Sequence, residues 1–249
     1  MSDADPEFAT VAAWTVEILD ELPTLDAIPG ACRGSGEPAA LQWLAQALEI
    51  GQNSRVLDLG GGIGGPAAWL HQRHGCLPVV ADPEAVALRG ARRLFGLPGV
   101  AVRDRLPFPE SSFDAAWTLA TLSTIDDQAL AIAELHRVLI PGGHLGLLEY
   151  VRAGGAVVDP PAGNRFFASA GLADALADAD FEVLGTLDVA TLDPPPHAWQ
   201  ERGSEVKQRL TERHGGEEAL AHSEAQERRF AHLLANGSLV VQALHARRP

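Results

Sequence analysis

Short apolar runs alternate with helical patterns along the sequence, which predicts an α/β fold built on a doubly wound, mostly parallel seven-stranded sheet. The run at 55–59 ends in a cluster of glycines, and the run at 77–81 ends in an acidic residue. Further strand-like runs lie at 100–102, 113–119, 144–150, 181–190 and 238–246. With 249 residues, the chain is long enough to bury the core of one such domain.

The stretch from Arg55 to Leu70, RVLDLGGGIGGPAAWL, reads as a buried strand, a glycine turn and the start of a helix. Glycines allow the backbone to turn sharply and to approach a ligand closely. Pro66 suits the first turn of a helix, where its missing N–H costs nothing. The free N–H groups of that helix start would lie beside the turn.

Gly60, Gly62 and Gly65 fit the dinucleotide-binding pattern loosely. Asp58 argues against that interpretation, because an acid two residues before the first glycine would repel a pyrophosphate. The stretch instead resembles the first motif of the class I S-adenosylmethionine-dependent methyltransferases, which is an acidic residue followed by x, G, x, G. An ordinary tight strand–helix turn without a ligand is the structural alternative.

Two later segments add to this resemblance. Residues 106–117 (LPFPESSFDAAW) are similar to the family pattern LPFxxxxFD, and residues 134–143 (ELHRVLIPGG) are similar to its helix, Pro and Gly–Gly sequence before a strand. The resemblance covers about 55–150 with motif detail and continues in element order to the C-terminus. It implies a Rossmann-like sheet whose last strand is antiparallel, S-adenosyl-L-methionine as cofactor, and methyl transfer by in-line displacement.

Asp82 follows the run at 77–81 and lies 22 residues beyond Gly60. An acid at about that distance from such glycines suits the two hydroxyls of a ribose. Asp82 could also cap the helix expected at 83–95, or serve both roles.

For adenine, the resemblance implies an acid just before the segment at 106–117. Asp104, with the backbone of Arg105, is the candidate, although it stands nearer to that segment than the acid of most relatives. A solvated loop acid is the structural alternative.

The resemblance also implies contacts at the amino-acid end of the cofactor. Asp58, Gly60 and Gly62 should line this end, and the carbonyl groups near Leu119 should accept hydrogen bonds from the ammonium group. Arg33, in a turn-rich loop expected at 29–38, is the candidate partner of the carboxylate.

Helical patterns flank the predicted sheet. The chain is expected to form a single domain: an N-terminal helical cap at 8–50, a cofactor-binding core at 51–150, and the rest of the sheet at 151–249 with a helical insertion at about 197–235. The helix at 8–22 is either a packed surface helix or a lid over the ligand.

Candidate acceptor contacts are aromatic residues in the segments expected to cover the site: Trp14, Tyr150 and Trp199. Tyr150 ranks first, because it leaves the strand at 144–150, and it is also a candidate catalytic residue. His197 and His222 are candidate general bases, because neutral imidazole titrates near working pH. The structural alternatives are aromatic helix anchors and solvated histidines. Many relatives carry a His at 121–125, where this chain has Ser and Thr.

The formal net charge of −14, without a Lys/Arg run, argues against nucleic acid or an anionic membrane as partner. Two cysteines form no disulfide framework, and no histidine pattern predicts a metal site, so we expect a cytoplasmic protein without metal. The abundance of Ala, Gly, Pro and Arg suggests a bacterial source. Homodimerisation remains open.

The functional prediction is methyl transfer to a small-molecule acceptor, in bacterial secondary metabolism. The alternative is the same fold binding S-adenosylmethionine or S-adenosylhomocysteine without methylation, as a cyclase or a regulatory module. An NAD(P)-dependent oxidoreductase is disfavoured by Asp58 and by the segments at 106–117 and 134–143.

Overall fold

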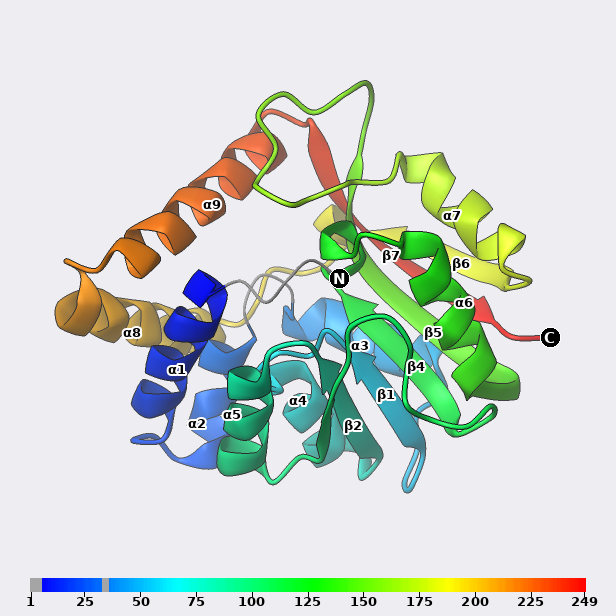
Figure 1. Ribbon diagram of the computed structural model, residues 1–249, viewed down its shortest axis with the longest axis horizontal. Helices are drawn as coiled ribbons and strands as arrows, with labels where there is room; N and C mark the ends of the chain where they lie inside the picture. The colour runs from blue at the N-terminus through cyan, green and yellow to red at the C-terminus, as the bar shows by residue number, and fades with distance from the viewer. Residues whose placement is uncertain (1–5, 33–35) are drawn as a thin grey trace.

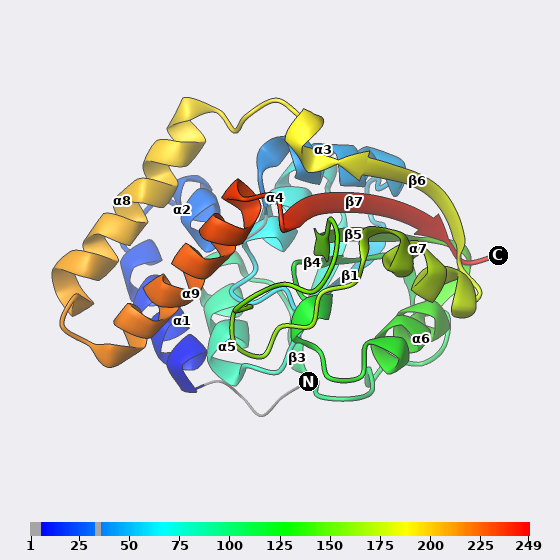
Figure 2. The same ribbon diagram turned by 90° about the horizontal axis from the view of Figure 1, so that it is seen from above.

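The computed structural model describes residues 6–32 and 36–249, and Figures 1 and 2 show two views of it. The described strands form one sheet: β1 Arg55–Leu59, β2 Leu77–Asp82, β3 Gly99–Ala101, β4 Phe113–Leu119, β5 Leu139–Arg152, β6 Glu182–Asp188 and β7 Leu239–Arg247. The described α-helices are α1 Pro6–Leu19, α2 Thr24–Ala31, α3 Pro38–Ala47, α4 Gly65–His74, α5 Ala85–Phe95, α6 Gln128–Val138, α7 Ser169–Asp178, α8 His197–His214 and α9 Glu218–Ala235. Two short 3-10 helices, η1 Leu122–Thr124 and η2 Val189–Thr191, follow β4 and β6.

The strands are ordered β3-β2-β1-β4-β5-β7-β6. In this order the strands from β3 to β5 are all parallel to one another, whereas β7 is antiparallel to both β5 and β6. The chain order reverses between β1 and β4, and ligands of doubly wound sheets bind beyond the C-terminal strand ends at such a point. The predicted seven-stranded, mostly parallel sheet is confirmed, including its antiparallel last strand.

The central strands are covered on both faces. In β1, Val56 packs into the hydrophobic cluster that includes α3 and α4, and Leu57 packs into the cluster that includes α6 and α7. Both side chains are fully buried. A strand covered on both faces needs apolar side chains in both directions, which explains the nearly unbroken apolar run there.

Four helices, α1, α2, α8 and α9, gather at one end of the molecule, on the left in Figure 1, and we call them the helical cap. They share a hydrophobic cluster that includes Val11 and Leu19 of α1 and Val206 of α8. Ile63 of the glycine turn and Ala87 of α5 join the same cluster. The cap is therefore packed against the side of the sheet where the glycine turn lies.

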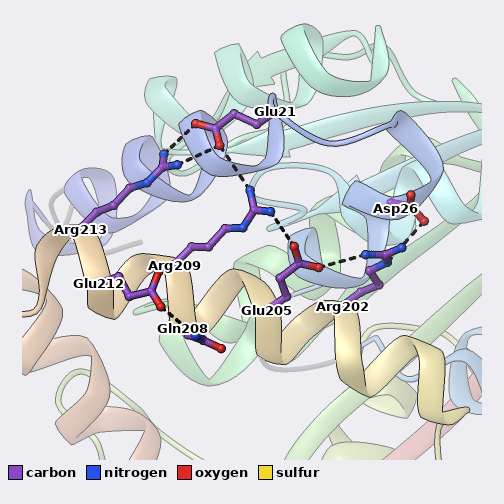
Figure 3. A network of polar contacts seen from close by, with 8 residues as sticks. All are labelled: Glu21, Asp26, Arg202, Glu205, Gln208, Arg209, Glu212 and Arg213. Carbon is purple, nitrogen blue, oxygen red and sulfur yellow. Dashed lines mark hydrogen bonds and ion pairs between the residues drawn. The ribbon is translucent and has the colours of Figure 1, made fainter.

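Ion pairs on the surface join α8 to the N-terminal part of the cap, as Figure 3 shows. The carboxylate of Glu21 accepts hydrogen bonds from Arg209 at 3.3 Å and from Arg213 at 2.8 Å. Arg202 lies 3.5 Å from Asp26, at the start of α2. These contacts connect segments that lie more than 170 residues apart in the sequence.

The structure corrects three predicted boundaries. Residues 29–31, expected in a loop, complete α2, because that helix buries an apolar face made of Ala27, Ile28 and Ala31. The strand expected at 144–150 begins at Leu139. Helix α5 begins only at Ala85, with Glu84 as its N-cap residue, so Asp82 does not cap it.

Candidate functional site

Three carboxyl groups are buried near the C-terminal ends of β1, β2 and β5, and we call them the carboxyl rim. Asp58 in β1 is 1% exposed, Asp82 at the end of β2 is 4% exposed, and Glu149 in β5 is 1% exposed. Burial disfavours the ionised form of a carboxyl group. It raises the pKa of Asp58 to about 7, of Asp82 to about 6 and of Glu149 to about 8. The rim therefore titrates near neutral pH.

Backbone N–H groups hold the carboxylate of Asp82 in place. Gly62 donates to Oδ2 at 2.9 Å, and Glu84 donates to Oδ1 at 2.9 Å. A carboxylate has about four lone-pair positions, so each oxygen can accept a further hydrogen bond. Because one donor belongs to the glycine turn, the turn and the end of β2 form one connected unit.

Asp58 packs directly under the glycine turn. A Cβ atom added at Gly61 would lie 2.4 Å from Oδ2 of Asp58, so only glycine fits there. This buried Oδ2 has no hydrogen-bond partner. Desolvation is the main cause of the raised pKa of Asp58, the indole of Trp117 opposes it, and the charge of Asp82 adds to it.

Gly60 and Gly62 serve different purposes in the turn. Both have positive φ angles, +74° and +54°, which L residues with a side chain seldom adopt. A Cβ atom at Gly60 would lie 2.2 Å from Cγ2 of Thr121, whereas one at Gly62 would meet nothing within 4 Å. Gly60 is therefore required for packing against the segment after β4, and Gly62 borders open space where a ligand can approach the backbone.

Glu149 is a rim residue that the sequence analysis missed. Its Oε1 accepts hydrogen bonds from the backbone N–H groups of Thr121 at 3.2 Å and Leu122 at 3.1 Å, while Oε2 has no partner. Glu149 thus fixes the segment that follows β4, which packs against Gly60. The signal was present, because a lone acid inside the apolar run HLGLLEY must be buried with partners.

The segment after β4 also anchors the long loop that follows β5. Ser123 donates its hydroxyl hydrogen to Asn164 at 2.8 Å, and its carbonyl accepts from the N–H of Arg165 at 2.7 Å. Gln128 donates to the carbonyl groups of Leu122 and Arg165, at 2.8 Å each. The position where many relatives carry a histidine is used here to hold a loop.

A small cavity of about 30 Å³ lies beside the end of β1. Apolar side chains of Leu59, Val102 and Ile125 line it together with Asp104, which is exposed. Arg105 follows Asp104 and is exposed. A carboxylate beside apolar side chains can accept a hydrogen bond from an amino group at the edge of a flat ring, while the face of the ring packs on the apolar side chains.

Two further predicted cofactor residues have different outcomes. Leu119 ends β4, and its carbonyl accepts a hydrogen bond from the hydroxyl of Thr121 at 3.2 Å. Arg33 lies outside the described residues, so its proposed role stays a prediction.

Tyr150 lies in an aromatic group that joins three parts of the chain. Its ring centroid is 4.8 Å from that of Phe230 in α9, and Phe166 of the loop after β5 lies 5.9 Å from Phe230. Desolvation raises the pKa of Tyr150 to about 12, so its hydroxyl is protonated at neutral pH. Tyr150 therefore connects the sheet to α9 and to the loop after β5.

The two predicted tryptophan contacts occupy helix interfaces. Trp14 of α1 stacks on His214 of α8 with ring centroids 4.0 Å apart. Trp199 of α8 is partly buried and packs on the cluster that includes α3 and α4. Both rings thus anchor helices of the cap.

The two predicted bases differ in environment. The side chain of His197 is 84% exposed and lies 3.3 Å from Glu201 of the same helix. The side chain of His222 is 43% exposed, and its Nε2 lies 3.1 Å from Glu7 of α1 and 3.0 Å from Gln226. His222 therefore lies between two cap helices, and His197 lies on the surface.

Within residues 6–32 and 36–249, no group of three or more His, Cys, Asp or Glu side chains is placed to hold a metal ion. Within the same residues, none of the helices combines the length and apolarity needed to cross a membrane.

Residues 57–147 match the family model described as a methyltransferase domain. The chain carries a methyltransferase domain. The methyltransferase GfsG of Streptomyces halstedii is 33% identical over 45% of this chain and 43% of its own length. A demethylmenaquinone methyltransferase of Thermus thermophilus is 36% identical over 45% of this chain and 56% of its own length. The chain spans about half the length of the curated relatives that it matches.

Solved structures share the fold over most of the domain. The [4+2]-cyclase SpnF matches with a TM-score of 0.70 and 24% identity, over 94% of each chain. Geranyl diphosphate C-methyltransferase from Streptomyces coelicolor matches with a TM-score of 0.62 and 18% identity, over 85% of this chain and 79% of that one. The fold is that of the class I S-adenosylmethionine-dependent methyltransferases.

Proposed function

We propose that the protein binds S-adenosylmethionine at the carboxyl rim and transfers its methyl group to a small-molecule acceptor. The observation that carries this proposal is the contact between Asp82 and Gly62, in which a buried carboxylate is fixed to a turn that borders open space. Such a carboxylate suits the two neighbouring hydroxyls of a ribose. The family match and the names of the relatives support the same assignment.

The other rim groups complete the proposed site. Asp58, which packs under the glycine turn, and the turn itself would hold the amino-acid end, and the carbonyl of Leu119 would accept from the ammonium group. Asp104 and the backbone of Arg105 would meet the adenine at the small cavity beside β1. Each group offers the acceptor or the apolar wall that its part of the cofactor requires.

The bound cofactor would supply an electrophilic methyl group on a sulfonium, whose sulfur keeps the electron pair of the broken bond. The chain's own contribution is orientation, because displacement at a methyl carbon needs the nucleophile, carbon and sulfur nearly in line. We place Tyr150 at the acceptor, because it faces α9 and the loop after β5. Of the candidate bases we favour His222 over His197, because His222 lies inside the helical cap.

Two measurements test the proposal. Titration calorimetry should show saturable binding of S-adenosylhomocysteine, and a folded protein that does not bind it would overturn the cofactor assignment. Release of S-adenosylhomocysteine from S-adenosylmethionine, in the presence of a panel of uncharged acceptors, should then reveal transfer.

Turnover should survive EDTA. A Mg²⁺-dependent methyltransferase needs several carboxylates gathered near the acceptor. Asp126 and Asp127 are adjacent in sequence, but Asp127 accepts the N–H of Leu130 at the start of α6. Loss of turnover with EDTA that Mg²⁺ restores would contradict the metal-free proposal.

A second candidate function is cofactor binding without methylation, as in a cyclase. It is favoured by the match to the [4+2]-cyclase SpnF, which covers 94% of both chains. The two functions differ in product: methyl transfer generates S-adenosylhomocysteine in proportion to product, and cyclisation leaves the cofactor intact. Mass spectrometry of the cofactor pool after turnover separates them.

We further propose that the acceptor is a small molecule of bacterial metabolism, handled in the cytoplasm. The net charge of −14 supports a small acceptor over a polyanion such as nucleic acid, because binding of a polyanion requires a basic surface.

A further inference from the structure

The helical cap contains a cavity of about 160 Å³ between its four helices. Its apolar walls include Val11 of α1, Pro29 of α2, Val206 and Leu210 of α8, and Leu220 of α9. Four of these side chains, all except Pro29, are at most 8% exposed. Helices distant in sequence thus enclose one shared, mainly apolar space.

Cys32 connects this cavity to the glycine turn. Cys32 lines the cavity, and a Cβ atom added at Gly65 would lie 2.7 Å from its backbone nitrogen. The thiol is also close enough to the carboxyl rim for the charge of Asp58 to add to burial in raising the pKa of Cys32. The cavity therefore borders the proposed cofactor site, and a group held in it would belong to the second substrate.

The charges around the cavity define which ligands fit. Among the described residues that line it, Lys207 is the single cation, and its Nζ lies 2.6 Å from the carboxylate of Glu227. Glu224 is a second acid in the lining. A phosphate or diphosphate group requires several cationic donors, whereas this lining has one paired cation and two acids. An anionic ligand is therefore disfavoured.

The size of the cavity indicates the extent of the ligand. A protein cavity of about 150 Å³ lined by aliphatic and aromatic side chains holds one benzene molecule. The cap cavity has nearly this volume, and its aliphatic walls are accompanied by polar groups at Thr15, Lys207, Thr211, Ser223, Glu224 and Glu227. Pockets of this kind bind apolar small molecules and orient them by a few polar groups.

We propose that the cap cavity binds an uncharged, apolar, ring-sized group, and that this group is the part of the methyl acceptor held away from the reacting atom. The proposal rests on the proposed function for the identity of the acceptor, but occupancy of the cavity can be measured without turnover.

Fluorobenzene provides the probe, with binding followed by ¹⁹F NMR in the presence and absence of S-adenosylhomocysteine. We expect saturable binding to the wild-type protein. Leu220→Phe places a larger side chain in the cavity and should weaken binding by at least about tenfold. Leu234→Phe makes the same change on the same helix at a residue that is 36% exposed and does not line the cavity, so its binding should remain normal.

Folding of each variant is judged by circular dichroism and by S-adenosylhomocysteine binding. If Leu220→Phe does not fold, Val11→Phe takes its place, because it fills the same cavity from α1. Fluorobenzene binding that persists in a folded, filled variant, or that is absent from the wild type, would overturn the proposal. So would competition of inorganic pyrophosphate with fluorobenzene. Failure to bind S-adenosylhomocysteine, with fluorobenzene binding intact, would instead refute the proposed function and leave the cavity assignment standing.

Discussion

The carboxyl rim and the helical cap are held together by different kinds of polar contact. In the rim, Asp82 and Glu149 are at most 4% exposed and accept hydrogen bonds from backbone N–H groups. In the cap, Glu21 and its two arginine partners have side chains that are 30–47% exposed. Buried polar groups must be paired, since leaving one unpaired is costly, whereas exposed ion pairs exchange readily with water.

This difference teaches which part of the molecule tolerates change. The rim couples the glycine turn, the end of β2 and the segment after β4 through buried contacts, so a change in any one of these segments disturbs the others. The cap helices are joined to one another by an apolar cluster and by surface ion pairs, whose contacts exchange readily with water. A substitution in a surface ion pair of the cap should therefore cost less stability than the loss of a buried contact in the rim.

The largest expected effect is at Glu149. Glu149→Leu removes the acceptor of two buried backbone N–H groups, at Thr121 and Leu122, and each unpaired donor costs about 1–3 kcal/mol of the free energy of unfolding. Chemical denaturation should show this loss, and S-adenosylhomocysteine should bind more weakly because the segment after β4 packs on Gly60.

Glu149→Gln is the matched control, because its amide oxygen can still accept both N–H groups. It should retain most of the stability and cofactor affinity that Glu149→Leu loses. Equal losses in the two variants would show that the carboxyl group does more than position this segment.

The second effect is at Asp82. Asp82→Ala removes the proposed acceptor of the ribose hydroxyls, and a hydrogen bond to a charged group contributes about 1.5–3 kcal/mol. Calorimetry should show S-adenosylhomocysteine binding weakened by about ten- to a hundredfold in a folded protein. Unchanged affinity would remove Asp82 from the site and leave its contact with Gly62 as a purely structural one.

The fold and the rim could be predicted from the sequence wherever residues close together in the chain determine the structure. The run at 55–59, the glycines after it and Asp82 after the next run specify strand, turn and strand end within a few residues of one another. The pairing of Thr121 with Glu149 joins two separate strand ends, and no local pattern encodes it. The sequence therefore predicted Asp58 and Asp82 as candidates and missed Glu149.

The cap was less predictable for the same reason. Helix α1 was expected from its periodicity and α8 and α9 as a helical insertion, whereas α2 was not predicted. The contacts that join these helices link Glu21 to Arg209 and Arg213, far apart in the chain. The stacking of Trp14 on His214 is likewise a long-range contact. Apolar periodicity shows that a helix has a buried face, but not which element covers it.

The third effect concerns pH and the free energy of unfolding of the cofactor-free protein. The pKa of Asp58 rises from 3.8 to about 7 and that of Glu149 from 4.5 to about 8, so the folded state retains protons that the unfolded state has lost. Stability must then fall as pH rises, by up to about 1.4 kcal/mol per pH unit for each retained proton. The fall should begin above the unfolded pKa values of 3.8 and 4.5 and end near the folded values of about 7 and about 8, and between pH 6.5 and pH 8 it can be followed without a contribution from histidines.

This window separates the rim from other titrating groups. The pKa values of His136 and His245 are lowered from 6.5 by burial, which makes stability increase with pH, but only below 6.5. Glu149→Gln should reduce the slope between 6.5 and 8, most clearly in the upper half of the window, where Asp58 with its pKa of about 7 has lost most of its proton and Glu149 with its pKa of about 8 has not. If the free energy of unfolding of the wild type stays constant or rises with pH in this window, the raised pKa values of the rim carboxyl groups are wrong.

The smallest effect is expected in the cap. Glu21→Gln removes the carboxylate that joins α8 to the end of α1, yet these pairs are solvent-exposed and contribute little to global stability. The melting temperature should therefore change less than in Glu149→Leu. Amide hydrogen exchange in α8 should increase, because the contact that holds this helix locally is weaker.

Glu201→Gln is the matched control, since Glu201 pairs with His197 of α8 itself and not with α1. If surface charge alone governs α8, both variants should raise its exchange equally, and 0.5 M salt should do the same to the wild type. If the link to α1 matters, only Glu21→Gln and salt should do so. A fall in melting temperature for Glu21→Gln as large as that for Glu149→Leu would break the comparison, because the cap would then depend on its polar contacts as strictly as the rim does.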